Sequence, residues 1–195
     1  MQSTTNSNTI KINQLAPQFE TKAFHAGKET KVKLKDLKRK WVILVFYPAD
    51  FTFICPTELG DFADHYDEFK KLNTEILSVS TDTVFVHKAW HDNSPMIAKI
   101  KFPMLADPTG NICKSYGTYI EQEGLSYRAT FIIDPDGNIK WYEIHDNSIG
   151  RSTTEILRKL KAAQYVREHG SEVCPVNWQP GAKTLKPGLD LVGKI

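Results

Sequence analysis

Hydrophobic residues in the first half of the chain form one continuous run followed by a helical stripe. Residues Trp41 to Tyr47 read WVILVFY, which predicts a strand buried on both faces. Pro48 ends this run. After Cys55, apolar residues recur every three or four positions and predict a core-facing helix; they are Leu59, Phe62, Tyr66 and Phe69. A predicted strand and a predicted helix therefore bracket Cys55.

The same pattern recurs once. Glu75 to Ser80 reads EILSVS, which predicts a second strand. Asp82 and Thr83 are possible N-caps for a following helix, because their side-chain oxygens can accept hydrogen bonds from its first amides. The apolar residues expected on this helix are Phe85, Val86, Ala89 and Trp90.

The later part of the chain predicts a hairpin and a helix. Thr130 to Ile133 and Ile139 to Ile144 are strand candidates, separated by the turn sequence DPDG. Ser152 to Glu155 reads STTE, a capping box that predicts the start of an amphipathic helix. Its apolar stripe is Ile156, Leu157, Leu160 and Ala163.

Alternating strands and helices that end in a hairpin and a helix indicate an α/β, thioredoxin-like fold with a central mixed sheet flanked by helices. The stretch after Cys174 carries too many prolines and glycines for regular structure and predicts an irregular C-terminal arm. We therefore expect a disordered segment at residues 1–9, a thioredoxin-like domain at 10–170 and an arm with Cys174 at 171–195.

Composition and charge give no indication of a nucleic-acid or membrane partner. Lys and Arg total 25 against 23 Asp and Glu, and the net charge of +2 is spread along the chain, so no nucleic-acid partner is indicated. The first 17 residues lack a signal core, and no apolar run approaches a membrane span. We expect a cytoplasmic protein with no membrane partner. The three cysteines Cys55, Cys113 and Cys174 are then more consistent with a transient, catalytic disulfide than with a structural one.

Cys55 is placed where a buried strand gives way to a helix. Amides in the first turn of a helix have no intrahelical partner and favour a thiolate over a thiol. Thr52 is expected either as the N-cap or with its hydroxyl turned toward the sulfur, and Pro56 weakens the first turn. The alternative is a buried, inert thiol, but these coinciding features favour reactivity. A thioredoxin-type dithiol is not indicated, because Glu58 stands where its second cysteine would be.

The stretch PADFTFICPTE has the form Pro-x-x-x-Thr-x-x-Cys and resembles the peroxidatic motif of peroxiredoxins, and EVCP around Cys174 resembles their resolving-cysteine motif. The resemblance extends over nearly the whole chain from about Ile10, and the ending DLVGKI is similar to the bacterial alkyl hydroperoxide reductase type of the family. Further matching segments are STDT, HKAW, RATF and IGR.

This resemblance implies a role for each residue of the active site. Cys55 would attack the peroxide and become a sulfenic acid. Thr52 would hold the thiolate and the peroxide with its hydroxyl, Pro48 would shield the pocket, and Arg128 would polarise the site.

The family pattern gives Glu58 and Arg151 supporting positions around that arginine. Without the motif, Glu58 would be interpreted as an ordinary acid in the first turn of a helix. Arg128 and Arg151 would be interpreted as solvated charges at strand ends.

The resemblance also implies partners. Cys174 would close a disulfide with Cys55 of another chain, which implies an obligate homodimer, expected to assemble into a decamer. The expected substrates are hydrogen peroxide and small organic hydroperoxides. The sequence has no phosphate loop or dinucleotide fingerprint, so we expect no bound cofactor; an external dithiol protein, a flavoprotein disulfide reductase or thioredoxin, would supply electrons.

Three further features were weighed. His87 and His91 are four residues apart and could share a metal, but no further ligands are suggested, so we interpret them as solvated or hydrogen-bonded and predict no metal site. Cys113 matches no redox motif and is assigned to packing or taken as incidental. The alternative function is a peroxide-sensing relay or a chaperone ring that uses the same reactive cysteine.

Overall fold

The computed structural model describes residues 10–195, so the segment predicted to be disordered, 1–9, lies outside the described residues. The chain forms two compact units, one up to Arg151 and one from Ser152 to Ile195, and each is described by itself. The domain boundary predicted between residues 170 and 171 stays a prediction.

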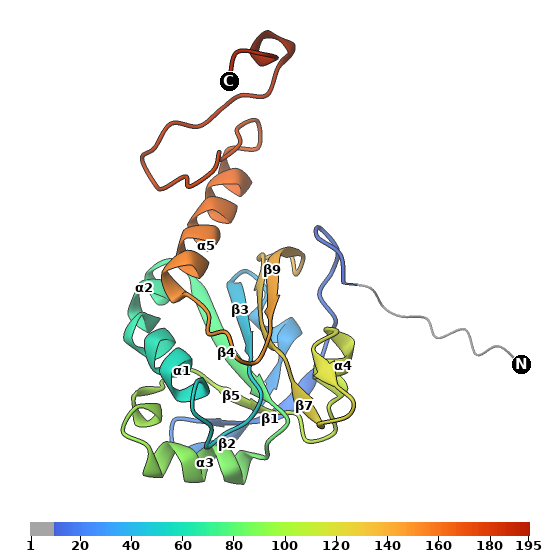
Figure 1. The fold of residues 1–195 in the computed structure, drawn as a ribbon, viewed down its shortest axis with the longest axis vertical. Helices are drawn as coiled ribbons and strands as arrows, with labels where there is room; N and C mark the ends of the chain where they lie inside the picture. Colours follow the sequence, from blue (N-terminus) through green and yellow to red (C-terminus); the bar gives the residue numbers. More distant parts are fainter. Residues whose placement is uncertain (1–9) are drawn as a thin grey trace, which may run out of the picture. The chain divides into compact units, whose positions relative to one another are not determined.

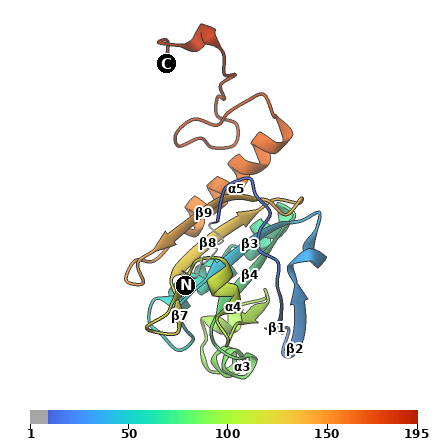
Figure 2. The same cartoon turned by 90° about the vertical axis from the view of Figure 1, so that its right-hand side faces the viewer.

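The first unit is built on a seven-stranded mixed sheet with the order β2-β1-β5-β4-β3-β8-β9. The central strand β3 pairs in parallel with β4 and antiparallel with β8. Figure 2 shows β2 and β9 at opposite edges. The strands are β1 Glu20–His25, β2 Lys28–Lys33, β3 Trp41–Phe46, β4 Thr74–Ser80, β5 Met104–Ala106, β8 Arg128–Ile133 and β9 Ile139–His145, with a separate pair β6 Tyr119–Ile120 and β7 Leu125–Ser126.

Helices cover both faces of this sheet. Figure 1 shows α1 and α2 on one side and α4 on the other. The helices of the unit are α1 Cys55–Asp64, α2 Tyr66–Lys71, α3 Val84–Asn93 and α4 Asn111–Ser115, with 3-10 turns η1 Leu34–Leu37 and η2 Ile97–Lys99. The α/β fold with a mixed sheet that the sequence predicts is therefore confirmed.

All six residues of β3 are buried, as its continuous hydrophobic run predicts. On the α4 side, an aromatic cluster fills the core: the ring of Tyr116 lies 5.3 Å from that of Phe46 and 5.0 Å from that of Phe131, centroid to centroid. Such edge-on and tilted contacts add to the burial of the rings themselves. Because both faces of β3 are covered, its carboxyl end is held firmly where the chain turns toward Cys55.

The helix predicted after Cys55 is interrupted. The four residues of its apolar stripe are all buried, but the chain breaks at His65 into α1 and α2. There the backbone leaves helical geometry (φ −96°, ψ 1°), and the ring Nδ1 of His65 lies 2.9 Å from the carbonyl oxygen of Asp61. This local contact does not alter the hydrophobic spacing, so the spacing alone did not predict the break.

The apolar stripe predicted on α3 is wrong in phase. Of its four residues only Trp90 is buried, and Phe85 is 76% exposed, whereas the polar His87 is fully buried. Burial of the imidazole is tolerated because both ring nitrogens have hydrogen-bond partners. Thr83 is the N-cap and accepts a hydrogen bond from the amide of Val86, as one of the two predicted alternatives requires.

The predicted hairpin is confirmed as β8 and β9. Its turn is closed by Asp134, whose Oδ1 accepts hydrogen bonds from the amides of Asp136 (3.0 Å) and Asn138 (2.8 Å). Gly137 has φ +91°, a left-handed conformation that favours glycine. Among the named strands β9 pairs with β8 alone, so it forms one edge of the sheet, where its first residue, Ile139, also exchanges backbone hydrogen bonds with Asn13 and Gln14.

The second unit contains α5 Thr153–Glu168 followed by a largely irregular segment. Ser152 caps α5 and accepts a hydrogen bond from the amide of Glu155, as the capping box predicts, but the Glu155 carboxylate pairs with Arg158. Beyond α5, regular structure is limited to the 3-10 turn η3 Leu189–Leu191 and one bridge between Val173 and Leu185. Within residues 10–195, no helix is long and apolar enough to cross a membrane.

Gly110 offers a test of packing at the start of α4. Its φ is +68°, and a Cβ there would lie 2.5 Å from Cε2 of the Tyr119 ring. Gly117 has nearly the same φ, +67°, but its Cβ would meet nothing within 4 Å. We predict that Gly117→Ala lowers the free energy of unfolding by about 1 kcal/mol through the backbone alone. Gly110→Ala should lose roughly 2–4 kcal/mol because overpacking adds to the backbone cost.

Urea unfolding of the reduced proteins at one protein concentration measures both losses. Equal losses for the two variants would show that the Tyr119 ring moves aside without cost.

Candidate active site

Cys55 is the first residue of α1, and its side chain is completely buried. The connection from β3 starts with Tyr47 and Pro48, which are also buried, and the N-cap of α1 is Ile54. The prediction that Thr52 could be the N-cap is therefore wrong: its Oγ1 donates a hydrogen bond to the carbonyl of Ala49 (2.9 Å) inside the connection. The helix begins three residues later, too far along the chain for Thr52 to cap it.

Arg128 brings a positive charge to the sulfur of Cys55. Its Nη1 donates to Sγ of Cys55 at 3.3 Å and to Oε2 of Glu58 at 2.8 Å. Its Nε donates to the backbone carbonyl of Asn147 at 3.0 Å, which fixes the direction of the guanidinium. The side chain is only 4% exposed. The cation therefore acts on the sulfur with little screening by water.

Glu58 lies between two arginines. Its carboxylate accepts hydrogen bonds from Nε and Nη2 of Arg151 at 2.9 and 2.8 Å, and from the backbone amide of Arg151 at 2.8 Å. Burial alone would raise the pKa of the Glu58 carboxyl, but the hydrogen bonds and charge of Arg151, with the charge of Arg128, hold this pKa below its usual value. Arg151 also donates to the carbonyl of Ala129 on β8 (2.8 Å).

The charges of this buried cluster do not balance among the three ionic side chains. Arg128 and Arg151 carry two positive charges, and Glu58 carries one negative charge. One positive charge is left, and it adjoins Cys55 through Arg128. The arrangement therefore favours an anion at this point, either a thiolate on Cys55 or negative charge that develops on a molecule attacked by it.

The connection before Cys55 is held by a second buried network. Asp50 accepts a hydrogen bond from the hydroxyl of Tyr47 (2.7 Å) and faces Nδ1 of His87 (2.8 Å). Nε2 of His87 lies 3.1 Å from the carbonyl oxygen of Leu105, which can only accept, so Nε2 donates in that hydrogen bond. Burial raises the pKa of Asp50, and His87 opposes that shift. Next to Asp50, Phe51 has φ +55°, a conformation that needs such support.

Sequence reasoning missed some of these contributors. His87 is hydrogen-bonded, one of the two states predicted for it, but it acts through Asp50, while His91 packs its ring edge-on against Phe24. Asn147, which receives the Nε–H of Arg128, carries no sequence signal. Asp50 could have been noticed as a carboxylate between two apolar residues. Among residues 10–195, no three His, Cys, Asp or Glu side chains gather as a possible metal site.

The two other cysteines have different environments. Cys113 is completely buried in the core, and burial, followed by the charge of Asp107, raises its pKa to about 12. A thiol that stays protonated reacts slowly, which is in line with the packing role predicted for Cys113. Cys174 lies in the second unit, is partly exposed, and is not bonded to another sulfur.

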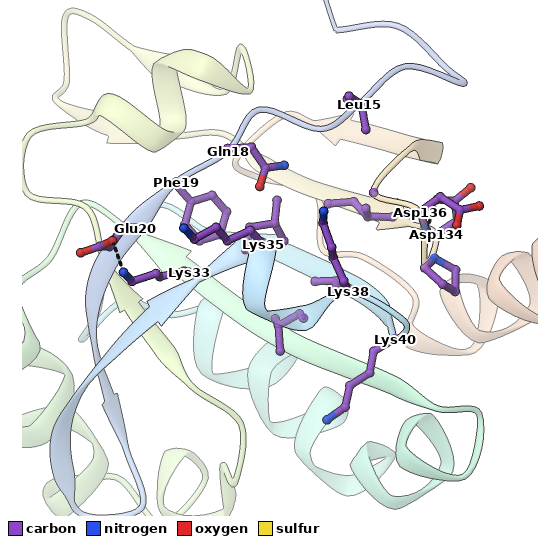
Figure 3. A pocket seen from close by; sticks show the side chains of 16 residues that line it. Leu15, Gln18, Phe19, Glu20, Lys33, Lys35, Lys38, Lys40, Asp134 and Asp136 are labelled. Atoms are coloured by element: carbon purple, nitrogen blue, oxygen red, sulfur yellow. Dashed lines mark hydrogen bonds and ion pairs between the residues drawn. The ribbon is translucent and has the colours of Figure 1, made fainter.

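A cavity of about 590 Å³ lies elsewhere on the first unit (Figure 3). Its lining includes the apolar residues Phe19 and Val42 and several lysines, among them Lys35 and Lys38. None of Cys55, Glu58 or Arg128 lines it. No cysteine lines this cavity, so thiol chemistry belongs to the cluster around Cys55.

Comparison with known proteins finds relatives over nearly the whole chain. The model of the AhpC/TSA family matches residues 12–142, and that of the C-terminal domain of 1-Cys peroxiredoxin matches residues 162–192. The chain is 53% identical to alkyl hydroperoxide reductase C of Salmonella typhimurium over 184 residues, 94% of this chain and 98% of the relative. It is 54% identical to alkyl hydroperoxide reductase C of Amphibacillus xylanus over 178 residues, 91% of this chain and 95% of the relative.

Two solved structures share the fold. The crystal structure of Enterococcus faecalis AhpC matches with a TM-score of 0.83 and 51% identity, covering 86% of this chain and 100% of that one. The reduced 2-Cys peroxiredoxin of Plasmodium vivax matches with a TM-score of 0.88 and 35% identity, covering 93% of this chain and 96% of that one. The thioredoxin-like fold predicted from the sequence is therefore confirmed.

Glu58 should contribute to stability in a pH-dependent way. Its folded-state pKa lies below the unfolded value of about 4.5, so its contribution is complete above that pH and is lost as the pH falls through the folded-state pKa. We predict that Glu58→Gln lowers the free energy of unfolding by about 3 kcal/mol at pH 7, because it leaves two buried arginines without their counter-charge. The difference from wild type should shrink below pH 4.5.

Urea unfolding over a pH series tests this. The control is Glu29→Gln, which removes an exposed partner of Lys22 and should cost no more than about 1 kcal/mol. A loss for Glu58→Gln that does not vary with pH would contradict the pairing.

Proposed function

Since the chain belongs to the AhpC/TSA family, we propose that Cys55 and Cys174 carry out its reaction, the thiol-dependent reduction of hydrogen peroxide and alkyl hydroperoxides. The observation that carries the assignment is the contact between Arg128 Nη1 and Cys55 Sγ at a helix start, inside a buried cluster with one positive charge in excess. This is the environment in which a cysteine is a nucleophile.

In the first step, the Cys55 thiolate attacks one oxygen of the peroxide. An S–O bond forms as the O–O bond breaks, the departing oxygen takes up a proton, and water or an alcohol leaves a sulfenic acid on Cys55. Negative charge moves from the sulfur to the departing oxygen. Arg128 is placed to stabilise that charge. The Glu58 carboxylate, hydrogen-bonded to both Arg128 and Arg151, holds the Arg128 guanidinium in position.

Thr52 and Pro48 complete the proposed site. The Thr52 hydroxyl donates a hydrogen bond to the Ala49 carbonyl. Its oxygen therefore remains free to accept a hydrogen bond from the O–H of a peroxide. Pro48, buried two residues after the end of β3, is proposed to shield the pocket from water. Because Cys55 is completely buried, a small peroxide reaches it far more readily than a protein client does, which favours the peroxidase over the relay or chaperone alternative.

In the second step, Cys174 of a partner chain condenses with the sulfenic acid. An S–S bond forms, the S–O bond breaks, and water is released. This step requires the first turn of α1 to open, and the N-cap residue Ile54 makes no side-chain hydrogen bond that would hold the turn closed. An external dithiol protein then reduces the disulfide; a flavoprotein disulfide reductase and a thioredoxin are both candidates. A compartment rich in such reductants is required, and we assign the chain to the cytoplasm.

We propose a homodimer assembled into a decamer. The edge strand β9 exposes Tyr142 (38%) and Ile144 (43%), and an unpaired edge strand can pair with a second copy. Near the active site, Phe51, Phe53 and Phe85 are 56%, 93% and 76% exposed. Exposed aromatic side chains of this size are typical of protein interfaces, and they supply a second surface for the ring.

The assignment of the cysteines is tested by three serine variants. Cys55→Ser should abolish peroxide consumption, because a serine hydroxyl does not ionise near neutral pH. Cys174→Ser should react with about one peroxide per chain and stop at the sulfenic acid, which mass spectrometry detects. Cys113→Ser is the control and should keep wild-type turnover. Full turnover by Cys55→Ser would refute the assignment.

The oligomer is tested by sedimentation velocity on reduced and disulfide-bonded protein. The reduced form should be the more tightly assembled, because disulfide formation unwinds the start of α1 beside the exposed aromatic residues. Phe53→Ser should weaken the ring and leave the dimer intact. A monomer in both redox states would refute the proposal.

A further inference from the structure

A pocket of about 420 Å³ adjoins Cys174 within the unit Ser152–Ile195. One wall is the α5 helix and the other is the chain that follows Cys174. The residues that line it are Glu155, Arg158, Lys159, Ala162, Cys174, Pro175, Val176 and Asn177. The thiol thus shares a small concave space with two cationic side chains.

Arg158 is fixed in this pocket from both walls. Its Nε and Nη2 donate to the two carboxylate oxygens of Glu155, each at 2.7 Å, and its Nη1 donates to the backbone carbonyl of Trp178 at 3.1 Å. Trp178 is itself anchored: it is only 3% exposed, and its indole N–H donates to the carbonyl of Ala182. Arg158 is 13% exposed, far less than an ordinary surface arginine.

Several groups act on the Cys174 thiol. The pKa of Cys174 lies above its ordinary value, because burial raises it, the charge of Arg158 only partly opposes that shift, and the carboxylate of Glu172 adds to it. The sulfur lies 4.0 Å from the carbonyl oxygen of Ala162, a contact that favours the protonated thiol. The pocket's other charged groups are Glu155 and Lys159, which lie 3.6 Å apart. With Glu172, two cations and two carboxylates act around the thiol, so loss of the Arg158 charge would leave the negative charge in excess.

We propose that Arg158 is a positioning residue for the resolving step, which holds a positive charge beside Cys174 and so increases the fraction of Cys174 present as thiolate. This inference rests on the proposed function, in which Cys174 attacks the Cys55 sulfenic acid. The thiolate sulfur forms the S–S bond, hydroxide leaves the Cys55 sulfur, and the proton released by Cys174 converts it to water. The peroxide already consumed is the only oxidant required.

Alkylation of Cys174 by iodoacetamide across a pH series tests the proposal in a Cys55→Ser, Cys113→Ser background, where Cys174 is the only thiol. Adding Arg158→Met should move the midpoint of the alkylation rate to higher pH and reduce the thiolate fraction at pH 7 roughly three- to tenfold. Arg158→Lys keeps the charge without the fork and should give an intermediate midpoint. Lys161→Met removes a charge from the same helix outside the pocket lining and should leave the midpoint unchanged.

Two results would overturn the role of Arg158. An unchanged midpoint in Arg158→Met shows that the charge does not act on Cys174. A lowered midpoint shows that Arg158 acts mainly by keeping the thiol buried.

The consequence for turnover is measured with all three cysteines present. In Arg158→Met, disulfide formation followed by stopped flow should slow several-fold at pH 7 and recover at higher pH, while the reaction of Cys55 with peroxide keeps its rate. A purely structural role would slow disulfide formation equally at every pH. If wild-type protein formed no Cys55–Cys174 disulfide, the proposed function would fail, whereas an unchanged alkylation midpoint refutes only the role of Arg158.

Discussion

The site depends on one interaction, the hydrogen-bonded ion pairs of the Glu58 carboxylate with Arg128 and Arg151. Through it, the first turn of α1, strand β8 and the segment after β9 are joined at a single buried point. An isolated buried ion pair is expensive to desolvate, and this cluster offsets that cost with hydrogen bonds to nearly every polar atom. The two arginines and the one glutamate together carry one positive charge in excess. This excess positive charge lies next to the sulfur of Cys55, through Arg128.

The connection before Cys55 and the turn after it differ in firmness. Upstream, Tyr47, His87 and Asp82 all hydrogen-bond to Asp50, so the strained backbone at Phe51 is fixed from several elements. Downstream, α1 begins without a side-chain cap and with a proline in its first turn. A peroxide therefore meets a preorganised site. The start of α1 at Cys55 and Pro56 has no side-chain cap, and the hydrogen bonds of Glu58 hold the turn that follows.

Local hydrophobic pattern predicted the elements best. The buried run of β3, the DPDG hairpin and the Ser152 cap of α5 each depend on neighbouring residues, and all are confirmed. The burial of His87 and the hydrogen bond from Arg128 to Asn147 depend on residues distant in sequence, and no local pattern contains them. The arginines were predicted only through their motif. By composition alone, Arg128 and Arg151 would have been assigned to solvent, and the structure places them among the most buried side chains.

The core thiol has a consequence for the endurance of the enzyme. Because burial raises the pKa of the Cys113 thiol, this thiol stays protonated near neutral pH and offers little reactive thiolate to oxidant in the surroundings. Oxidation at that sulfur would place a polar acid among Phe46, Tyr116 and Phe131 and would break up the packing beneath the sheet. Burial of Cys113 therefore protects the core of the protein from the peroxide that reacts at Cys55 in every cycle.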